Sequence, residues 1–195
     1  MQTTIPARQR KNIMEGQPRT PASKPALTTA ERFIAAFGNH PAGVSVITAD
    51  AGGGPVALTA TSVCSVSVDP PLLAFSASSK SSSTPTIRSA ETIVVHLLTA
   101  GQLPIAQLGA TSGIDRFADT SMWKRLSSGE PYFPGVTTWI RGRIVNTLEA
   151  SGATLVLVEA LEIGGQSAAA NGDAGRPLVY HSRAWHALGE HSRIR

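Results

Sequence analysis

The run from Ser76 to Pro85 holds the densest group of side chains that could bind a ligand in this sequence. Six serines and Thr84 surround a single cation, Lys80. Hydroxyls, backbone amides and one cation gathered in a turn can hold a mononucleotide phosphate without a glycine-rich motif. Composition alone leaves two interpretations open, a phosphate site and a solvated loop.

A second polar stretch interrupts otherwise apolar sequence between Thr59 and Ser67. Its hydroxyl residues are Thr59, Thr61, Ser62, Ser65 and Ser67. A buried hydroxyl needs a hydrogen-bond partner, and a planar ring with carbonyls and ring nitrogens, such as an isoalloxazine, offers several. The alternative is an edge strand whose polar face lies in water.

The common short catalytic motifs are absent from the sequence. It contains no GxxxxGK[ST], GxGxxG, GxSxG or HExxH pattern. The five histidines are too scattered to predict a metal, and a lone cysteine, Cys64, forms no internal disulfide. We therefore expect no metal, a reducing cytoplasm as the location, and Cys64 as a small buried residue.

Strands should be the main elements that position these stretches. Runs rich in β-branched residues predict strands at 43–48, 55–61, 72–77, 92–98, 138–148 and 154–163, with a final strand at 177–180. Residues 50–55 have hairpin length, so the first two strands should pair antiparallel. The pattern favours a small closed or partly open barrel. A sandwich is the competing architecture.

Helical signals are short. Thr28 and Glu31 match a capping box and predict that a helix begins there. Thr84 should be the N-cap of a second helix with Pro85 at its first position, and residues 102–108 should form a third. Residues 164–175 are poor in bulky apolar side chains and should be a surface loop.

The excess positive charge is confined to the N-terminal arm, residues 1–26. The arm carries five basic side chains against one acidic one, whereas the remaining chain carries twelve of each. The arm is proline-rich and should be disordered. The rest divides into a domain at 27–190 and a tail at 191–195. The interpretation as a nucleic-acid-binding protein depends on the arm alone, so we expect no nucleic-acid partner. No apolar run is long enough to predict a membrane span.

The order and spacing of several segments resemble the flavin reductase family of FMN-binding split barrels over about residues 30–188. The segments that carry the resemblance are Pro41 to Thr48, Leu58 to Ser62, Ser65 to Leu72, Ser82 to Thr84 before Ile87, Asp115 to Phe117, and Pro177 to His181. The resemblance implies a mainly β fold, a Greek-key split β-barrel of six or more strands with a few short helices, and a homodimer.

The resemblance also implies where the ligands bind. FMN would be the flavin, with FAD or riboflavin as alternatives, and NAD(P)H would be the substrate. Residues expected along the ring and ribityl chain are Thr59, Ala60, Thr61, Ser62, Ser65, Val66 and Ser67. Residues expected at the phosphate are Ser78, Ser79, Lys80, Ser82 and Thr84. Phe117 would pack at the flavin edge or in the core, and His181 is a candidate neighbour of the nicotinamide.

Two departures from the family pattern bear on activity. Many members carry Gly-Asp-His where this chain has Ser151-Gly152-Ala153, so a histidine linked to nicotinamide handling is missing. His96 stands where an asparagine is common, and we favour a buried strand histidine over a flavin neighbour. The leading interpretation is a flavin reductase that transfers a hydride from NAD(P)H to FMN and supplies a flavin-dependent monooxygenase. The alternative is a flavin-binding or carrier protein without turnover.

Overall fold

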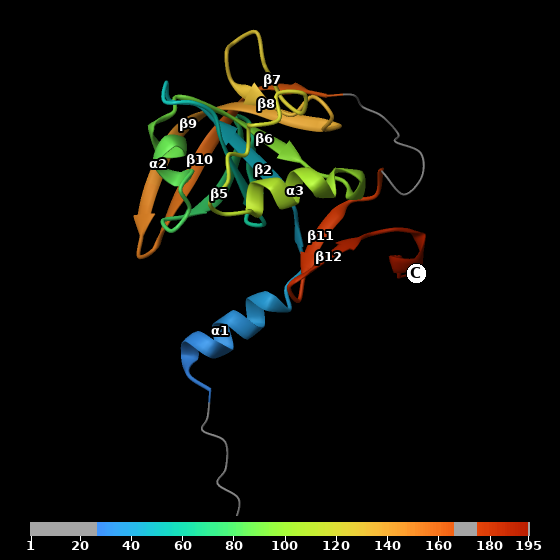
Figure 1. Ribbon diagram of the computed structural model, residues 1–195. Coiled ribbons are helices and arrows are strands. Elements are labelled where there is room, and N and C mark those ends of the chain that lie inside the picture. The colour runs from blue at the N-terminus through green and yellow to red at the C-terminus, as the bar shows by residue number, and fades with distance from the viewer. Residues whose placement is uncertain (1–26, 166–174, 195) are drawn as a thin grey trace, which may run out of the picture.

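A seven-stranded antiparallel sheet forms the body of the protein in the computed structural model, which describes residues 27–165 and 175–194 (Figure 1). The predicted arm and most of the predicted loop at 164–175 lie outside the described residues. The strand order is β3-β2-β6-β9-β10-β5-β4. The strands are β2 (Ser45–Ala49), β3 (Val56–Ala60), β4 (Cys64–Val68), β5 (Pro71–Ser78), β6 (Thr92–Leu97), β9 (Thr138–Ala150) and β10 (Ala153–Gly164).

Smaller elements surround this sheet. A three-stranded sheet consists of β1 (Ala42–Gly43), β11 (Leu178–His181) and β12 (Ala184–Ala187), and a two-stranded ladder of β7 (Lys124–Arg125) and β8 (Pro131–Tyr132). The helices are α1 (Thr29–Gly38), α2 (Thr84–Ser89) and α3 (Leu103–Ala110), with 3-10 turns η1 (Ala100–Gln102) and η3 (Glu190–Ser192). None of the helices in the described ranges is long and apolar enough to cross a membrane. The predicted mainly β fold with few helices is confirmed.

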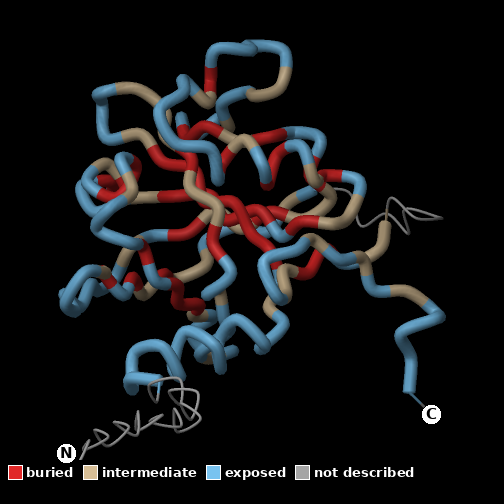
Figure 2. The backbone as a smooth tube through the Cα atoms, turned by 60° about the horizontal axis from the view of Figure 1, so that its bottom comes forward, coloured by how far each residue is buried: buried red, intermediate tan, exposed pale blue. Residues whose placement is uncertain are grey.

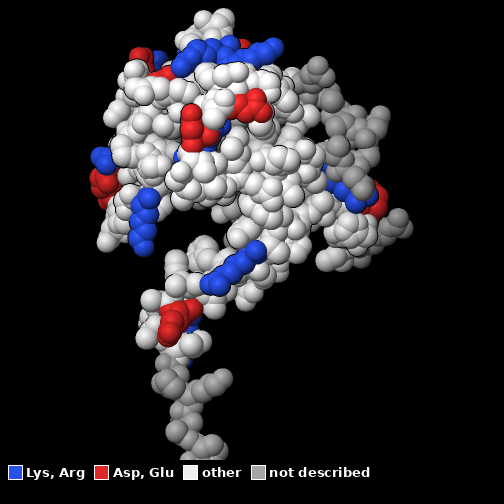
Figure 3. All heavy atoms as spheres, in the orientation of Figure 1, with Lys and Arg blue, Asp and Glu red and all other residues white. Residues whose placement is uncertain are grey.

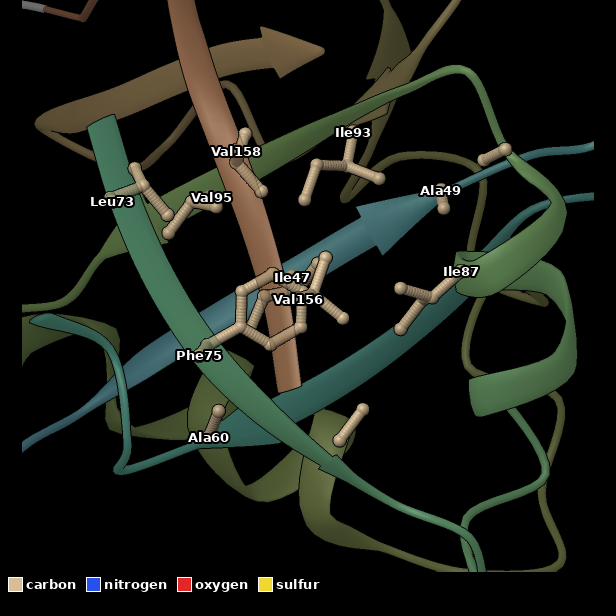
Figure 4. Packing of buried hydrophobic residues seen from close by; sticks show 12 residues of the cluster. Ile47, Ala49, Ala60, Leu73, Phe75, Ile87, Ile93, Val95, Val156 and Val158 are labelled. Carbon is tan, nitrogen blue, oxygen red and sulfur yellow. The ribbon is translucent and has the colours of Figure 1, made fainter. Parts of the chain in front are cut away.

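The sheet curls around one of two buried hydrophobic clusters in the described chain. Ile47 of β2, Phe75 of β5 and Val156 of β10 are fully buried in one cluster, and Ala60 of β3 joins them although β3 and β5 lie at opposite sides of the strand order (Figure 4). Buried segments therefore run through the middle of the molecule, with exposed loops around them (Figure 2). Within the described residues no ladder joins β3 to β5, so the curled sheet is not closed.

The six long strand predictions all correspond to observed strands, and the predicted antiparallel pairing of β2 with β3 is present. The capping box is also confirmed, because the Thr28 N–H donates to Glu31 Oε2 over 2.7 Å and the Glu31 N–H donates to Thr28 Oγ1 over 3.2 Å. The third helix begins one residue later than predicted, after a 3-10 turn. Strands β7, β8 and β12 were not predicted, and β4 corresponds to the edge strand that was one of two interpretations of the stretch between Thr59 and Ser67.

Two local predictions are wrong. Ser83, not Thr84, is the N-cap of α2, and it makes no side-chain capping bond. The Thr84 hydroxyl instead donates to Ser78 O, which closes the preceding turn. Cys64 is exposed rather than buried because it begins edge strand β4, whose side chains are mostly exposed.

Helix α1 extends away from the sheet (Figure 1). None of its residues is buried, and Phe33, Ile34 and Phe37 are each more than 60% exposed. A helix of ten residues is marginal in water without packing. Its apolar side chains therefore lack, within the described chain, the tertiary contacts that usually stabilise a helix of this length.

Candidate functional site

A hollow of about 350 Å³ lies where the ends of β3 and β5 meet the β9–β10 turn. Strand β10 pairs with β5 so that Ala153 lies opposite Ser78, which brings the turn against the end of β5. We call this space the flavin hollow, because it lies among residues that the family resemblance assigns to the flavin. Its lining residues are Leu58, Thr59, Ala60, Thr61, Ser62, Ser76, Ser78, Gly152 and Ala153.

The serine turn, Ser78–Thr84, borders this hollow and is held by its own polar groups. The Ser79 N–H and Oγ both donate to Gly152 O over 3.0 Å. The Thr84 Oγ1 donates to Ser78 O over 2.7 Å. Lys80 and Ser82 are exposed, and their side chains make no hydrogen bond or ion pair with a described residue. The turn is therefore preformed, and it leaves the Lys80 ammonium and the Ser82 hydroxyl without a partner in the described chain. The Ser78 and Ser81 hydroxyls accept from the Lys80 and Ser83 N–H groups, and both keep their protons.

Two of the ring-side hydroxyls are bonded within the protein. Ser62 Oγ accepts from the Ser76 N–H over 2.9 Å and donates to Ser76 O over 3.2 Å, which fastens the β3–β4 loop to β5 at the hollow. Thr59 Oγ1 donates to Ala106 O of α3 over 2.7 Å, so its proton is already used. Thr61 is exposed. The structure thus brings Thr59, Ala60, Thr61, Ser62 and Ser78 together around the hollow, but the hydroxyls of Thr59 and Ser62 both serve the scaffold as well.

Four of the predicted site residues lie elsewhere. Ser65, Val66 and Ser67 belong to edge strand β4 and do not line the flavin hollow. This matches the alternative of an edge strand with a polar face in water. Phe117 is 6% exposed, and its ring lies 5.1 Å from that of Trp123. That position matches core packing, and contact of these four residues with a flavin stays a prediction.

Sequence reasoning missed several residues at the site. Ser76, Gly152 and Ala153 line the hollow, and the last two lie where the family pattern departs from this chain. Arg116 was noted only as part of a motif. Its Nη2 donates to Thr111 O over 2.6 Å, its Nη1 lies 3.5 Å from Ser83 Oγ, and its buried Nε has no partner among the described residues. The Asp115–Phe117 motif was the sequence signal that could have identified Arg116.

A second hollow of about 650 Å³ adjoins the first at Thr61 and Ser62, which line both. We call it the larger hollow. The other residues that line it are Phe37, Gly38, His40, Pro41, Ala42, Gly43, Val63, Cys64, Tyr180, His181 and Arg183. His181, the candidate nicotinamide neighbour, therefore lines a hollow that shares two lining residues with the flavin hollow.

Other polar groups with little exposed surface, outside these two hollows, are paired within the protein instead. Glu130, 6% exposed, accepts from Thr92, Ser128 and Arg141, the last over 2.8 Å. Burial acts to raise the pKa of Glu130, but these hydrogen bonds outweigh it and leave that pKa below its usual range. The hydrogen bond from Arg125 likewise lowers the pKa of Asp50. We call Glu130 together with its three donors, Thr92, Ser128 and Arg141, the Glu130 network.

His96 is the second paired interior group and is fully buried on β6, as favoured from the sequence. Its Nδ1 lies 2.9 Å from Val46 O, and its Nε2 accepts from the Phe133 N–H over 3.1 Å. This arrangement needs a neutral ring with the proton on Nδ1. Burial lowers the pKa of His96 to about 4. In the described parts of the chain, no group of three or more His, Cys, Asp or Glu residues is placed to hold a metal ion.

Comparison with known proteins places the chain in one family. The family model described as "Flavin reductase like domain" matches residues 37–189. An NADH:FMN oxidoreductase from Rhodococcus qingshengii is 40% identical over 163 residues, which cover 82% of this chain and 84% of the relative. The chain therefore belongs to the flavin reductase like family. It is an oxidoreductase of that class.

Solved structures agree with this assignment. A flavin reductase domain protein from Arthrobacter sp. FB24 superposes with a TM-score of 0.74 at 32% identity, covering 81% of this chain and 94% of that one. BorF, the flavin reductase component of a bacterial two-component tryptophan halogenase, superposes with a TM-score of 0.71 at 25% identity, covering 83% of this chain and 99% of its own.

Proposed function

We propose that this protein is an NAD(P)H:flavin oxidoreductase that reduces FMN. The observation that carries the proposal is the junction of two hollows at Thr61 and Ser62, one bordered by the serine turn and the other by His181. Such a junction suits two planar ligands that must meet face to face. The 40% identical relative that is named an NADH:FMN oxidoreductase supports the same function.

The residues around the flavin hollow fit a phosphorylated flavin. Lys80 and Ser82 offer a free cation and a free hydroxyl at its border, and charge-assisted hydrogen bonds are the strong ones for phosphate. Ala60, Gly152 and Ala153 are small, which leaves room for a flat ring against the strand ends. Ser79 and Thr84 would act by holding the turn in shape.

The chemistry needs position more than proton transfer. When bound, the flavin supplies a ring nitrogen, N5, that accepts a hydride from the nicotinamide. The protein holds the two rings in register and excludes water, which requires no nucleophile and no acid–base pair. The nicotinamide would enter through the larger hollow, next to His181.

The direct test measures binding and turnover on the purified protein. We expect a visible flavin spectrum after FMN is added, and oxidation of NADH or NADPH that depends on FMN, with FAD and riboflavin compared. Failure to bind FMN or FAD at tens of micromolar would refute the flavin site. Tight flavin binding without oxidation of either nucleotide would instead favour the carrier alternative.

We further propose that the curled sheet is a split barrel that functions as a homodimer. The uncovered α1 supports a second copy as its partner, because Phe33, Ile34 and Phe37 expose on the order of 350 Å² together. Two such helices and the surfaces that receive them would bury roughly the 1,200–2,000 Å² of a standard interface. Light scattering should give a dimer for the native chain and a monomer for Phe33→Glu. A flavin-bound native monomer would contradict the proposal.

The acceptor of the reduced flavin would be a flavin-dependent monooxygenase in the cytoplasm. BorF is named as the reductase component of such a two-component system, a halogenase in that case. Residues 1–26 would be dispensable, since every proposed site residue lies in the domain at 27–190. A chain starting at Ala26 should keep its FMN reduction, and a large loss of turnover in a folded truncation would show that the arm takes part.

A further inference from the structure

The turn between β11 and β12 places an arginine at the larger hollow by an unusual backbone. His181 pairs with Ala184, so Ser182 and Arg183 form a two-residue turn with φ values of 48° and 63°. Both residues are in the left-handed region, where asparagine and glycine are preferred in hairpin turns of this kind. A Cβ atom there is sterically unfavourable, so Arg183 adopts this conformation at a local energetic cost.

The same turn is fixed in place. The Ser182 N–H donates to Gly38 O over 2.8 Å, and Ser182 Oγ donates to Asn39 Oδ1 over 3.3 Å. These bonds join the hairpin to the C-terminal end of α1. Arg183 therefore projects from a clamped turn and not from a free loop.

Charge at the larger hollow is positive only. That charge belongs to Arg183; the imidazoles of His40 and His181 also line the hollow, and none of its described lining residues is an aspartate or a glutamate. Arg125, Arg141 and Arg143 each pair with a carboxylate, whereas the guanidinium of Arg183 has no hydrogen bond or ion pair with any described residue. Elsewhere on the visible face, blue and red atoms mostly lie side by side (Figure 3).

The rest of the lining suits a flat organic group. Pro41, Val63 and Tyr180 give the hollow an apolar wall, and its volume of about 650 Å³ is within the range of small-molecule sites. An apolar wall, an unpaired guanidinium and imidazole donors together match a ligand with aromatic rings joined by phosphates. The junction with the flavin hollow at Thr61 and Ser62 puts one end of that ligand beside the flavin.

We propose that Arg183, assisted by His40, binds the diphosphate of the pyridine nucleotide in the larger hollow. This inference rests on the proposed function, since it names how the substrate of that site is held. Arg183 is here a binding residue that sets the affinity for the nucleotide. The guanidinium fits a diphosphate better than a point charge would, because it can donate two parallel hydrogen bonds.

The test uses ADP-ribose, which has the diphosphate but no nicotinamide, titrated calorimetrically into FMN-saturated full-length protein. Arg183→Gly removes the cation and is compatible with a φ of 63°, so the variant should be at least as stable as the native protein. We expect its affinity for ADP-ribose to fall by roughly 10-fold, as for one charge-assisted hydrogen bond. The KM for NADH should rise by a similar factor.

Controls separate this role from others. Arg183→Lys should recover part of the affinity, and Arg193→Gln, an exposed arginine outside both hollows, should bind ADP-ribose as the native protein does. Unchanged ADP-ribose affinity in Arg183→Gly, an equal loss in Arg193→Gln, or no binding by the native protein would overturn the proposal. A loss seen for FAD but not for ADP-ribose would assign the arginine to the flavin instead. ADP-ribose binding needs no turnover, so it decides the matter even if NADH oxidation is not found.

Discussion

The Glu130 network and the serine turn are both rich in polar side chains, yet they use them in different ways. Around Glu130 each carboxylate oxygen has a partner within the protein, and the carboxylate is nearly fully buried. At the serine turn, Ser79 and Thr84 are bonded internally while Lys80 and Ser82 are left exposed. A buried polar group must be satisfied by the fold itself, whereas an exposed one can be satisfied by a ligand. A high number of polar side chains therefore does not by itself indicate a binding site. Hydrogen-bond donors without a partner in the protein do.

The largest effect should come from breaking the Glu130 network. Glu130→Ala removes the acceptor of three donors and leaves Arg141 without its carboxylate, and loss of one partner of a largely buried pair costs about 3 kcal/mol or more. Chemical denaturation should show this loss of unfolding free energy. FMN affinity of the folded fraction should not change.

A matched exposed pair provides the control for that variant. Glu159 bonds Arg143, but the side chains are 28% and 50% exposed. Glu159→Ala should cost less than about 1 kcal/mol, the usual range for such pairs. Equal losses for the two variants would mean that the network contributes no more than a surface ion pair.

The second prediction concerns His96 and pH. Its pKa is about 4 in the fold against 6.5 without burial, so the unfolded chain binds the proton more readily. The stability that depends on this difference is complete above about pH 6.5, declines as pH falls, and levels off below about pH 4. It amounts to about 3 kcal/mol over that range.

His96→Gln checks this prediction, since an amide can donate to Val46 O and accept from the Phe133 N–H without titrating. Denaturation curves between pH 4 and 7 should show a shallower decline for the variant than for the native protein. Parallel declines would mean that carboxylates, and not His96, set the acid sensitivity.

The sequence predicted the strands well and the individual hydroxyl contacts poorly, for a physical reason. The β-branched runs at 43–48 and 92–98 specify strands because their side chains fit a pleated, buried surface. A hydroxyl carries no such information. Thr59 bonds α3 and Ser62 bonds β5, and these partners lie 47 and 14 residues away along the chain. The role of Gly152 depends on the register of β10 against β5, which no local pattern encodes.

The third prediction tests whether Lys80, which has no partner in the described chain, donates hydrogen bonds to the phosphate. Lys80→Ala should lower the affinity for FMN by roughly 10- to 150-fold, the range of a charge-assisted contact, and leave the affinity for riboflavin almost unchanged. Lys124→Ala, an exposed lysine on β7, should change neither ligand. Fluorescence titration of both flavins measures these affinities. Equal losses of affinity for FMN and riboflavin would show that Lys80 does not bind the phosphate. Arg116 would then be the cation to examine next.

The smallest effect should come from Thr84, whose hydroxyl is already spent on Ser78 O. Thr84→Val keeps the shape but removes this bond, which should lower the unfolding free energy by about 1 kcal/mol. Because the hydroxyl has no proton left to donate to a phosphate, FMN affinity should fall much less than in Lys80→Ala. Thr84→Ser keeps the bond and should restore both values. The opposite result would be that Thr84→Val lowers FMN affinity as strongly as Lys80→Ala while riboflavin affinity stays unchanged. That result would make the hydroxyl a direct phosphate contact, and it would contradict the distinction between internally bonded and free donors in the serine turn.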